Sequence, residues 1–149
     1  MIMIKTYFLL FGLLLLSGCG GTDATSYRTV PLDENVTLQV GEKVGLAGDG
    51  VTELEIKSVR DDSRCPVNAD CIWAGTAFAV LELHKNPRLA SADAPPPETL
   101  SVEWLKDATT TLTVRPRYKV AFVKLNPEAQ LGKTIAQGDY RITLRLTRL

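Results

Sequence analysis

The side chains best suited to chemistry lie together in one short segment, residues 61–75, with the sequence DDSRCPVNADCIWAG. Two cysteines, Cys65 and Cys71, stand close together within it. Cysteines at this spacing can form a disulfide or can bind a metal such as zinc. The zinc alternative lacks ligands, because His84 is the single histidine of the chain and no second cysteine pair is present.

Two interpretations of segment 61–75 concern its surface. As a recognition loop, a small closed ring would lose little conformational entropy when it binds a partner. The residues that would make contact are Arg64, Pro66, Asn68, Asp70 and Trp73. As a plain connection between two strands, the segment would instead pair Arg64 with Asp61 or Asp62 and would pack Trp73 over the cysteines.

A third interpretation of the same segment is a calcium site. Calcium prefers oxygen ligands from carboxylates and amides. The segment offers four such residues, Asp61, Asp62, Asn68 and Asp70. The EF-hand spacing is absent, however, and aspartate and asparagine are also ordinary turn residues. These four residues are therefore weak metal candidates.

Catalysis has little support in the sequence. A Ser-His-Asp arrangement would depend wholly on His84, and no Gly-x-Ser-x-Gly motif is present. His84 stands at the polar end of a predicted strand and alternates with Glu82 and Val80, which indicates a solvated edge residue. Pairs of carboxylates could still meet in space, as in glycoside hydrolysis. We expect a non-catalytic protein without a cofactor, with an envelope hydrolase as the lesser alternative.

The N-terminus has the layout of a secretory signal peptide. Lys5 precedes an apolar run from Tyr7 to Leu16, which is shorter than the roughly 18 residues of a membrane-spanning helix. The sequence Leu16-Ser17-Gly18-Cys19 resembles the lipobox of bacterial lipoproteins. The resemblance implies that the signal peptide, residues 1–18, is cleaved and that Cys19 carries lipid (palmitate among its acyl chains).

The lipoprotein resemblance also implies a place in the cell envelope. Gly20 stands where an aspartate commonly retains such proteins in the inner membrane, which favours the outer membrane and a domain facing the periplasm. In that oxidising compartment we expect Cys65 and Cys71 to form a disulfide. A ring of this size is worth roughly 2–2.5 kcal/mol of stability in the chain-entropy model.

The expected partners follow from anchoring and from charge. They are the membrane, through the N-terminal lipid, and an envelope protein. Nucleic acid is not expected, because 17 basic side chains balance 17 acidic ones and give no strong overall field.

Segment 61–75 resembles a second pattern as well. Its order is Asp-Ser-Arg-Cys-Pro, four residues, Cys, one residue, Trp, one residue and Gly. We associate this order with uncharacterised secreted or lipid-anchored bacterial proteins, together with the Asp139-Tyr140 start of the final strand. The resemblance implies no particular activity.

Strands must position these residues, because apolar and polar side chains alternate with a period of two from Val36 onward. In the last such run, Ile142 and Leu144 point inward while Arg141 and Thr143 point outward. About eight short strands predict an antiparallel β-sandwich, with a small closed barrel as the alternative. We expect a lipidated, flexible tether at residues 19–34 and a single domain at residues 35–149.

A basic stripe is a further candidate surface. If the last two long strands are neighbours, five cations face the same way: Arg115, Arg117, Lys119, Arg141 and Arg145. Such a face would suit phosphate-rich lipid or an acidic partner. We favour the simpler interpretation of a solvated face, balanced by Glu53, Glu55 and Glu82 nearby.

Overall fold

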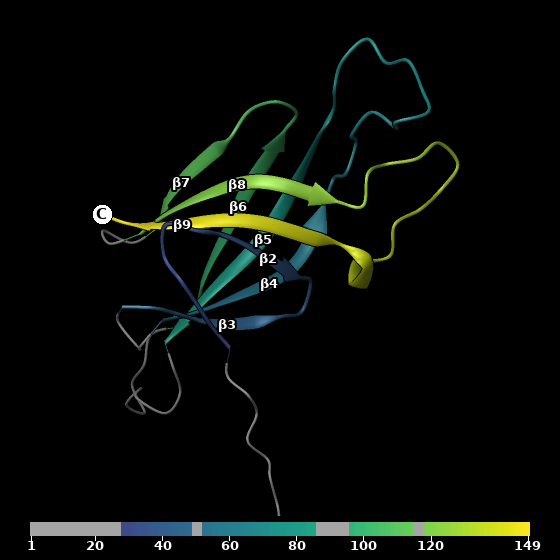
Figure 1. Cartoon of the computed structure of the whole chain (residues 1–149). Helices are drawn as coiled ribbons and strands as arrows, with labels where there is room; N and C mark the ends of the chain where they lie inside the picture. Colours follow the sequence, from purple (N-terminus) through teal and green to yellow (C-terminus); the bar gives the residue numbers. More distant parts are fainter. Residues whose placement is uncertain (1–27, 49–51, 86–95, 115–117) are drawn as a thin grey trace, which may run out of the picture.

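The computed structural model describes residues 28–48, 52–85, 96–114 and 118–149. The signal peptide, the lipobox with Cys19, and Arg115 and Arg117 lie outside these residues. Within them the chain forms strands and one short 3₁₀ turn, η2 (Gln137–Asp139), with no α-helix (Figure 1). The strands are β1 (Thr29–Val30), β2 (Asn35–Gln39), β3 (Lys43–Leu46), β4 (Thr52–Arg60), β5 (Thr76–Lys85), β6 (Glu98–Leu105), β7 (Thr110–Val114), β8 (Tyr118–Asn126) and β9 (Arg141–Arg148).

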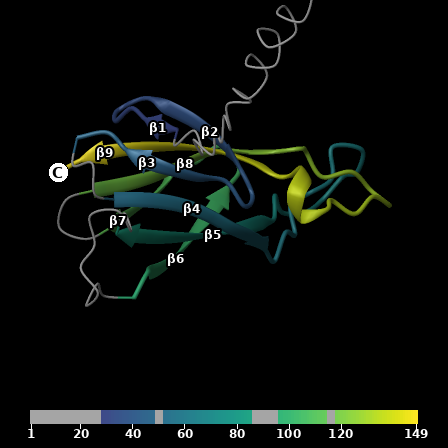
Figure 2. The same cartoon turned by 90° about the horizontal axis from the view of Figure 1, so that it is seen from below.

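The strands form two sheets that pack face to face. Sheet A has the order β1-β3-β4-β5-β6, and sheet B has the order β2-β9-β8-β7. Figure 2 shows β8 and β9 in a separate layer from β4 and β5. All pairings are antiparallel except that of β1 with β3. The sheets do not close on each other, so the prediction of a β-sandwich is confirmed and the barrel alternative is wrong.

The core lies between the sheets and follows the period-two alternation. Ile142, Leu144 and Leu146 of β9 are fully buried against the other sheet, where Leu54 and Leu81 are also fully buried. Each such side chain contributes roughly 1.5–3 kcal/mol relative to remaining exposed. On β9 the alternate residues Arg141 and Arg145 are exposed, which fixes the register of this strand, because a slip by one residue would reverse both faces. On β4 the alternation is less strict, since Glu53 and Glu55 beside Leu54 are also buried.

The folded domain begins earlier than residue 35, so the predicted tether is too long. β1 pairs in parallel with β3, the Gly45 amide donates to the Arg28 carbonyl at 2.9 Å, and Val30 is 1% exposed. A two-residue strand shows no periodicity along the chain. The position of β1 depends on β3, because hydrogen bonds to the edge of β3 satisfy the backbone groups of β1.

The connection between β4 and β5 carries segment 61–75. Its two ends run side by side, because the Ser63 amide donates to the Thr76 carbonyl at 2.8 Å and the Cys65 amide to the Ala74 carbonyl at 2.8 Å. Gly75 permits this approach: it has φ +72°, and a Cβ there would lie 1.9 Å from the Ser63 carbonyl oxygen. The segment is therefore an ordered extension of the β4–β5 hairpin.

In the described part of the chain, no helix is long and apolar enough to cross a bilayer.

Candidate functional site

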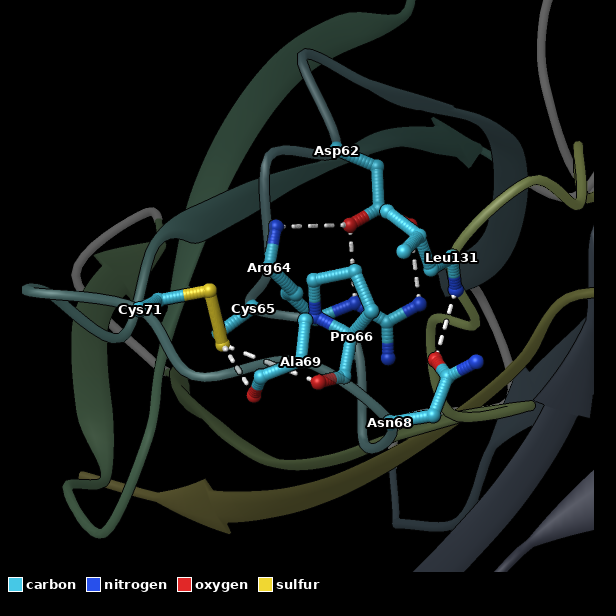
Figure 3. Close-up of a disulfide and its surroundings, with 8 residues drawn as sticks. All are labelled: Asp62, Arg64, Cys65, Pro66, Asn68, Ala69, Cys71 and Leu131. Atoms are coloured by element: carbon cyan, nitrogen blue, oxygen red, sulfur yellow. Dashed lines mark hydrogen bonds and ion pairs between the residues drawn. A yellow bond between two sulfur atoms is a disulfide. The ribbon is translucent and has the colours of Figure 1, made fainter.

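Cys65 and Cys71 form the predicted disulfide, with their Cα atoms 6.0 Å apart (Figure 3). Inside the ring the Ala69 amide donates to the Pro66 carbonyl at 3.1 Å. The ring therefore holds a tight turn at the tip of segment 61–75. Pro66 contributes to its rigidity, because the proline ring fixes φ.

A second loop, residues 127–136 between β8 and β9, lies beside the disulfide ring. The Val67 amide donates to the Ala129 carbonyl at 2.9 Å, and the Leu131 amide donates to Asn68 Oδ1 at 2.7 Å (Figure 3). We call residues 61–75 and 127–136 the distal loops. One extends sheet A and the other sheet B, at the end of the sandwich away from the C-terminus (Figure 1).

Arg64 is an internal residue of the distal loops, 6% exposed. Its Nε and Nη2 donate to the two carboxylate oxygens of Asp62, each at 2.8 Å. Nη1 donates to the Leu125 carbonyl and Nη2 to the Pro127 carbonyl, both at 3.0 Å. Arg64 therefore joins the two loops, and its predicted role as an exposed contact is wrong. The alternative, in which Arg64 pairs with Asp62, is confirmed.

Asp62 lies between Arg64 and Tyr140, whose hydroxyl donates to Asp62 Oδ2 at 2.8 Å. Burial by itself raises the pKa of Asp62, but the hydrogen bonds from Arg64 and Tyr140 outweigh it and leave that pKa below its ordinary value. Burial, together with the hydrogen bond to Asp62, raises the pKa of Tyr140 to about 12. The three side chains therefore stabilise one another in their ordinary charge states at neutral pH.

This arrangement gives no support to the predicted calcium site. Asp62 is neutralised by Arg64, and Asn68 Oδ1 accepts the Leu131 amide. Within the described residues, Asp61, Asp62 and Asp70 do not gather into a group that could hold a metal ion. Asp61 and Asp70 instead remain exposed at the loop surface.

Large apolar side chains project from the distal loops into solvent. Val67 is 59% exposed, Trp73 63% and Leu131 65%, while Ile72 is fully exposed. Trp73 therefore does not pack over the disulfide, and that part of the structural interpretation is wrong. Exposed apolar patches on soluble domains commonly mark interaction sites. Of the predicted contact residues, Pro66, Asp70 and Trp73 are surface residues of this patch or its rim.

A cleft of about 590 Å³ opens beside the disulfide ring. Pro66 and Val67 line one wall, and Leu105 and Val123 line others. Trp104 of β6 also lines it, with the Arg64 guanidinium 5.5 Å from its ring centre. The rim carries charges of both signs, from Lys106, Asp107, Lys124 and Glu128.

Trp104 and the cleft could not be found by sequence reasoning. Trp104 occupies an inward position of an ordinary alternating strand, where a core role is the natural expectation. Val123 is brought to the cleft by an irregularity in the pairing of β8 with β9 between Phe122 and Lys124. Nothing in the local sequence signals that irregularity.

His84 lies within a cluster of charged side chains on the outer face of sheet A. Its Nε2 is 3.1 Å from Glu55 Oε2 and 3.4 Å from Glu82 Oε2. Since β5 lies between β4 and β6 and the His84 side chain is half-buried, the prediction of a solvated edge residue is wrong. Burial raises the pKa of Glu55, but hydrogen bonds and charge from Lys43 and Lys57 outweigh it, so that pKa is lowered overall.

The three potential ligand atoms of Glu55, Glu82 and His84 lie within 4.8 Å of one another, close enough to hold a metal ion. However, the Lys57 ammonium is 3.2 Å from Glu55 and 3.5 Å from Glu82, and the Lys43 ammonium is 3.1 Å from Glu55. Two ammonium groups therefore already balance the two carboxylates. A divalent cation would add charge to a neutral cluster.

Three of the five residues of the predicted basic stripe lie in the described part of the chain, whereas Arg115 and Arg117 lie outside it. β8 and β9 are neighbours, and Lys119, Arg141 and Arg145 are exposed on the outer face of sheet B. Glu53, Glu55 and Glu82 belong to β4 and β5 of sheet A. The predicted balance of the stripe by these glutamates is therefore wrong, because the two sets lie on different sheets.

No protein-family model, curated protein or solved structure matches the chain.

Proposed function

We propose that this protein is a lipid-anchored cell-envelope protein whose domain acts as a non-catalytic binding module. The distal loops, with the adjoining cleft, are the binding surface. The observation that carries the proposal is the concentration of exposed apolar side chains (Val67, Ile72, Trp73 and Leu131) on two loops that are tied together.

Pre-organisation supports a binding role for this surface. The disulfide, the Arg64 hydrogen bonds and the Asn68 contact order both loops before any partner arrives. A surface that is already ordered loses less entropy on association. Tryptophan is also among the residues that most often dominate binding energy at protein interfaces.

An envelope protein is the partner that this surface fits best. The exposed apolar side chains spread over both loops and extend beyond the cleft, as a protein–protein contact requires. The distal loops hold four acidic and two basic side chains, and Arg64 is internally paired with Asp62. A partner surface with apolar residues and a basic rim would complement them.

Anchoring rests on the N-terminal sequence. Cleavage after Gly18 and lipidation of Cys19 would tether the domain to a membrane, with Gly20 favouring the outer membrane and a periplasmic position. The intact mass of the protein from a membrane fraction tests this step. We expect a chain that begins at Cys19 and carries acyl groups, and an unmodified cysteine would contradict it.

The partner is tested by photo-crosslinking in cells. Ile72 is the position for the crosslinking residue, because its side chain is fully exposed, whereas Asn68 is occupied by its bond to Leu131. We expect one reproducible protein adduct, identified by mass spectrometry. Its absence from a folded, correctly located protein would contradict the proposal.

A small ligand in the cleft is the second candidate, favoured by a volume of about 590 Å³, which falls among small-molecule sites. A Trp73→Phe variant leaves Trp104 as the one tryptophan of the chain, so its emission reports on the cleft. The probe is anilinonaphthalene sulfonate. Quenching of the Trp104 emission by this probe, and its loss when Val123→Asp is added, would favour a small ligand in the cleft. Unchanged emission would remove it.

A further inference from the structure

Acidic side chains are absent from the strands of sheet B. β2, β7, β8 and β9 contain five basic residues and no aspartate or glutamate: Lys119, Lys124, Arg141, Arg145 and Arg148. The strands of sheet A, in contrast, carry both signs, with five glutamates (Glu53, Glu55, Glu82, Glu98 and Glu103) and four basic residues (Lys43, Lys57, Arg60 and Lys85). The acidic side chains of the strands therefore all lie on sheet A, whereas the strands of sheet B carry positive charge alone.

Four of these cations lie on the outer face of sheet B. Register places Lys119 opposite Thr147, Lys124 opposite Thr143, and Arg145 opposite Ala121. Arg141 is opposite Asn126, and all four cations are exposed. Small and hydroxyl-bearing side chains therefore separate the cations, and Thr37, Thr111 and Thr113 continue this composition onto β2 and β7.

Among the residues that the structure describes, no carboxylate forms an ion pair with these four cations. Within the described part of the chain, the ion pairs involve other basic residues. Arg145 Nε donates to Asn35 Oδ1 at 3.0 Å and Arg141 Nη1 to the Gly138 carbonyl at 3.0 Å, both neutral acceptors. Like charges on neighbouring strands repel, so this face is less stable than a mixed one. This loss of stability is offset where the positive electrostatic field of the face serves to attract a negatively charged partner.

We propose that the outer face of sheet B is a docking surface for the phosphate headgroups of an anionic lipid bilayer. Guanidinium and ammonium groups bind phosphate oxygens through charge-assisted hydrogen bonds. The intervening threonine hydroxyls add neutral donors. The face carries charge and hydroxyl groups but no large apolar wedge, which suits contact with headgroups without insertion.

The length of chain before the domain favours a lipid surface over an acidic protein. Cys19 precedes Arg28 by nine residues, which span at most about 30 Å when fully extended. A lipid on Cys19 would keep the domain within about one domain diameter of a bilayer. This choice of occupant rests on the proposed lipidation, whereas the positive charge of sheet B does not.

The test uses a chain of residues 22–149, which lacks the signal and Cys19. Every described strand and core residue lies within 28–149, so this chain keeps the described contacts. Co-sedimentation with phosphatidylglycerol–phosphatidylcholine vesicles at 50 mM salt measures binding. We expect binding that is lost at 500 mM salt, and that falls about 25-fold in the double variant Lys119→Gln/Arg145→Gln, at roughly fivefold per cation.

The matched control is Lys85→Gln/Lys133→Gln, which changes the net charge equally at exposed positions on β5 and on a distal loop. Its binding should stay within about twofold of the unchanged chain. A second double variant, Lys124→Gln/Arg141→Gln, should reproduce the loss if the first one melts early.

Several results would overturn the proposal. They are equal binding to pure phosphatidylcholine vesicles, no binding to anionic vesicles, and equal losses in the test and control variants. Displacement by inorganic phosphate at matched ionic strength would indicate a site for a free anion. Binding to polyglutamate beads but not to vesicles would indicate an acidic protein. Each result leaves the crosslink from Ile72 untouched, so the two proposals fail separately.

Discussion

At the scale of single residues, three polar side chains decide how the distal loops are held. Arg64 and Asp62 are two positions apart, so their pairing was predictable from the sequence. Tyr140 and the carbonyls of Leu125 and Pro127 come from more than 60 positions away. Their convergence depends on the tertiary fold, and for that reason the burial of Arg64 was not predictable.

Replacing Arg64 tests this arrangement. Arg64→Ala removes the donors that satisfy Asp62 and two backbone carbonyls inside the protein. Removing one partner of a buried pair costs on the order of 3–5 kcal/mol. Since Asp62 keeps some exposure, we expect the free energy of unfolding in urea to fall by about 3 kcal/mol. The exposed Arg60→Ala should change it by less than about 0.5 kcal/mol. Equal small changes in both would contradict the role of Arg64.

Tyr140 should make stability depend on alkaline pH. Its pKa is about 12 in the folded protein and 10.0 as an isolated side chain. A raised folded pKa gives stability that is complete below pH 10 and lost as pH rises through about 12. We expect the difference in free energy of unfolding between the unchanged protein and Tyr140→Phe to shrink over that range. A constant difference would count against the hydrogen bond to Asp62.

Asp62 should act in the opposite direction. Its folded pKa lies below the ordinary value of 3.8, so the stability it provides is present above pH 3.8 and is lost as pH falls through the folded pKa. In acid titrations followed by circular dichroism, Asp62→Asn should show a smaller loss of stability below pH 4 than the unchanged protein. Parallel acid curves would contradict this.

At the scale of elements, alternation predicts the longer strands but not their neighbours. The last strand was predicted with its inward and outward faces, because period two is a local signal. β1 was missed, since two residues have no period and its pairing depends on β3. The edge position predicted for His84 failed for a related reason, because strand order is set by long-range contacts.

The β4–β5 connection offers a test at this scale. Gly75→Ala would place a Cβ 1.9 Å from the Ser63 carbonyl oxygen, at a φ of +72°. Gly132 has φ +75° with nothing within 4 Å of its added Cβ, so Gly132→Ala shares the backbone strain without the clash. We expect Gly75→Ala to lower the free energy of unfolding by about 2 kcal/mol more than Gly132→Ala. Equal losses would show that the connection can relax.

At the scale of the whole molecule, the sandwich gives its surfaces different properties. The distal loops form one end, with exposed apolar side chains, and the C-terminus lies at the other (Figure 1). The strands of sheet B carry basic side chains and no acidic ones, whereas the strands of sheet A carry both. The sandwich could be predicted from strand number and spacing. The single sign of charge on the strands of sheet B and the joining of two loops could not, because both depend on which strands belong to which sheet.

Photo-crosslinking in cells at two matched positions tests the central claim, that the distal loops bind an envelope partner, most directly. Ile72 and Leu149 are both exposed apolar residues, at opposite ends of the sandwich. We predict a discrete protein adduct from Ile72 that Trp73→Asp weakens, and none from Leu149. The same adducts from both positions, or none from Ile72 in a folded and correctly located protein, would contradict a binding role for the distal loops.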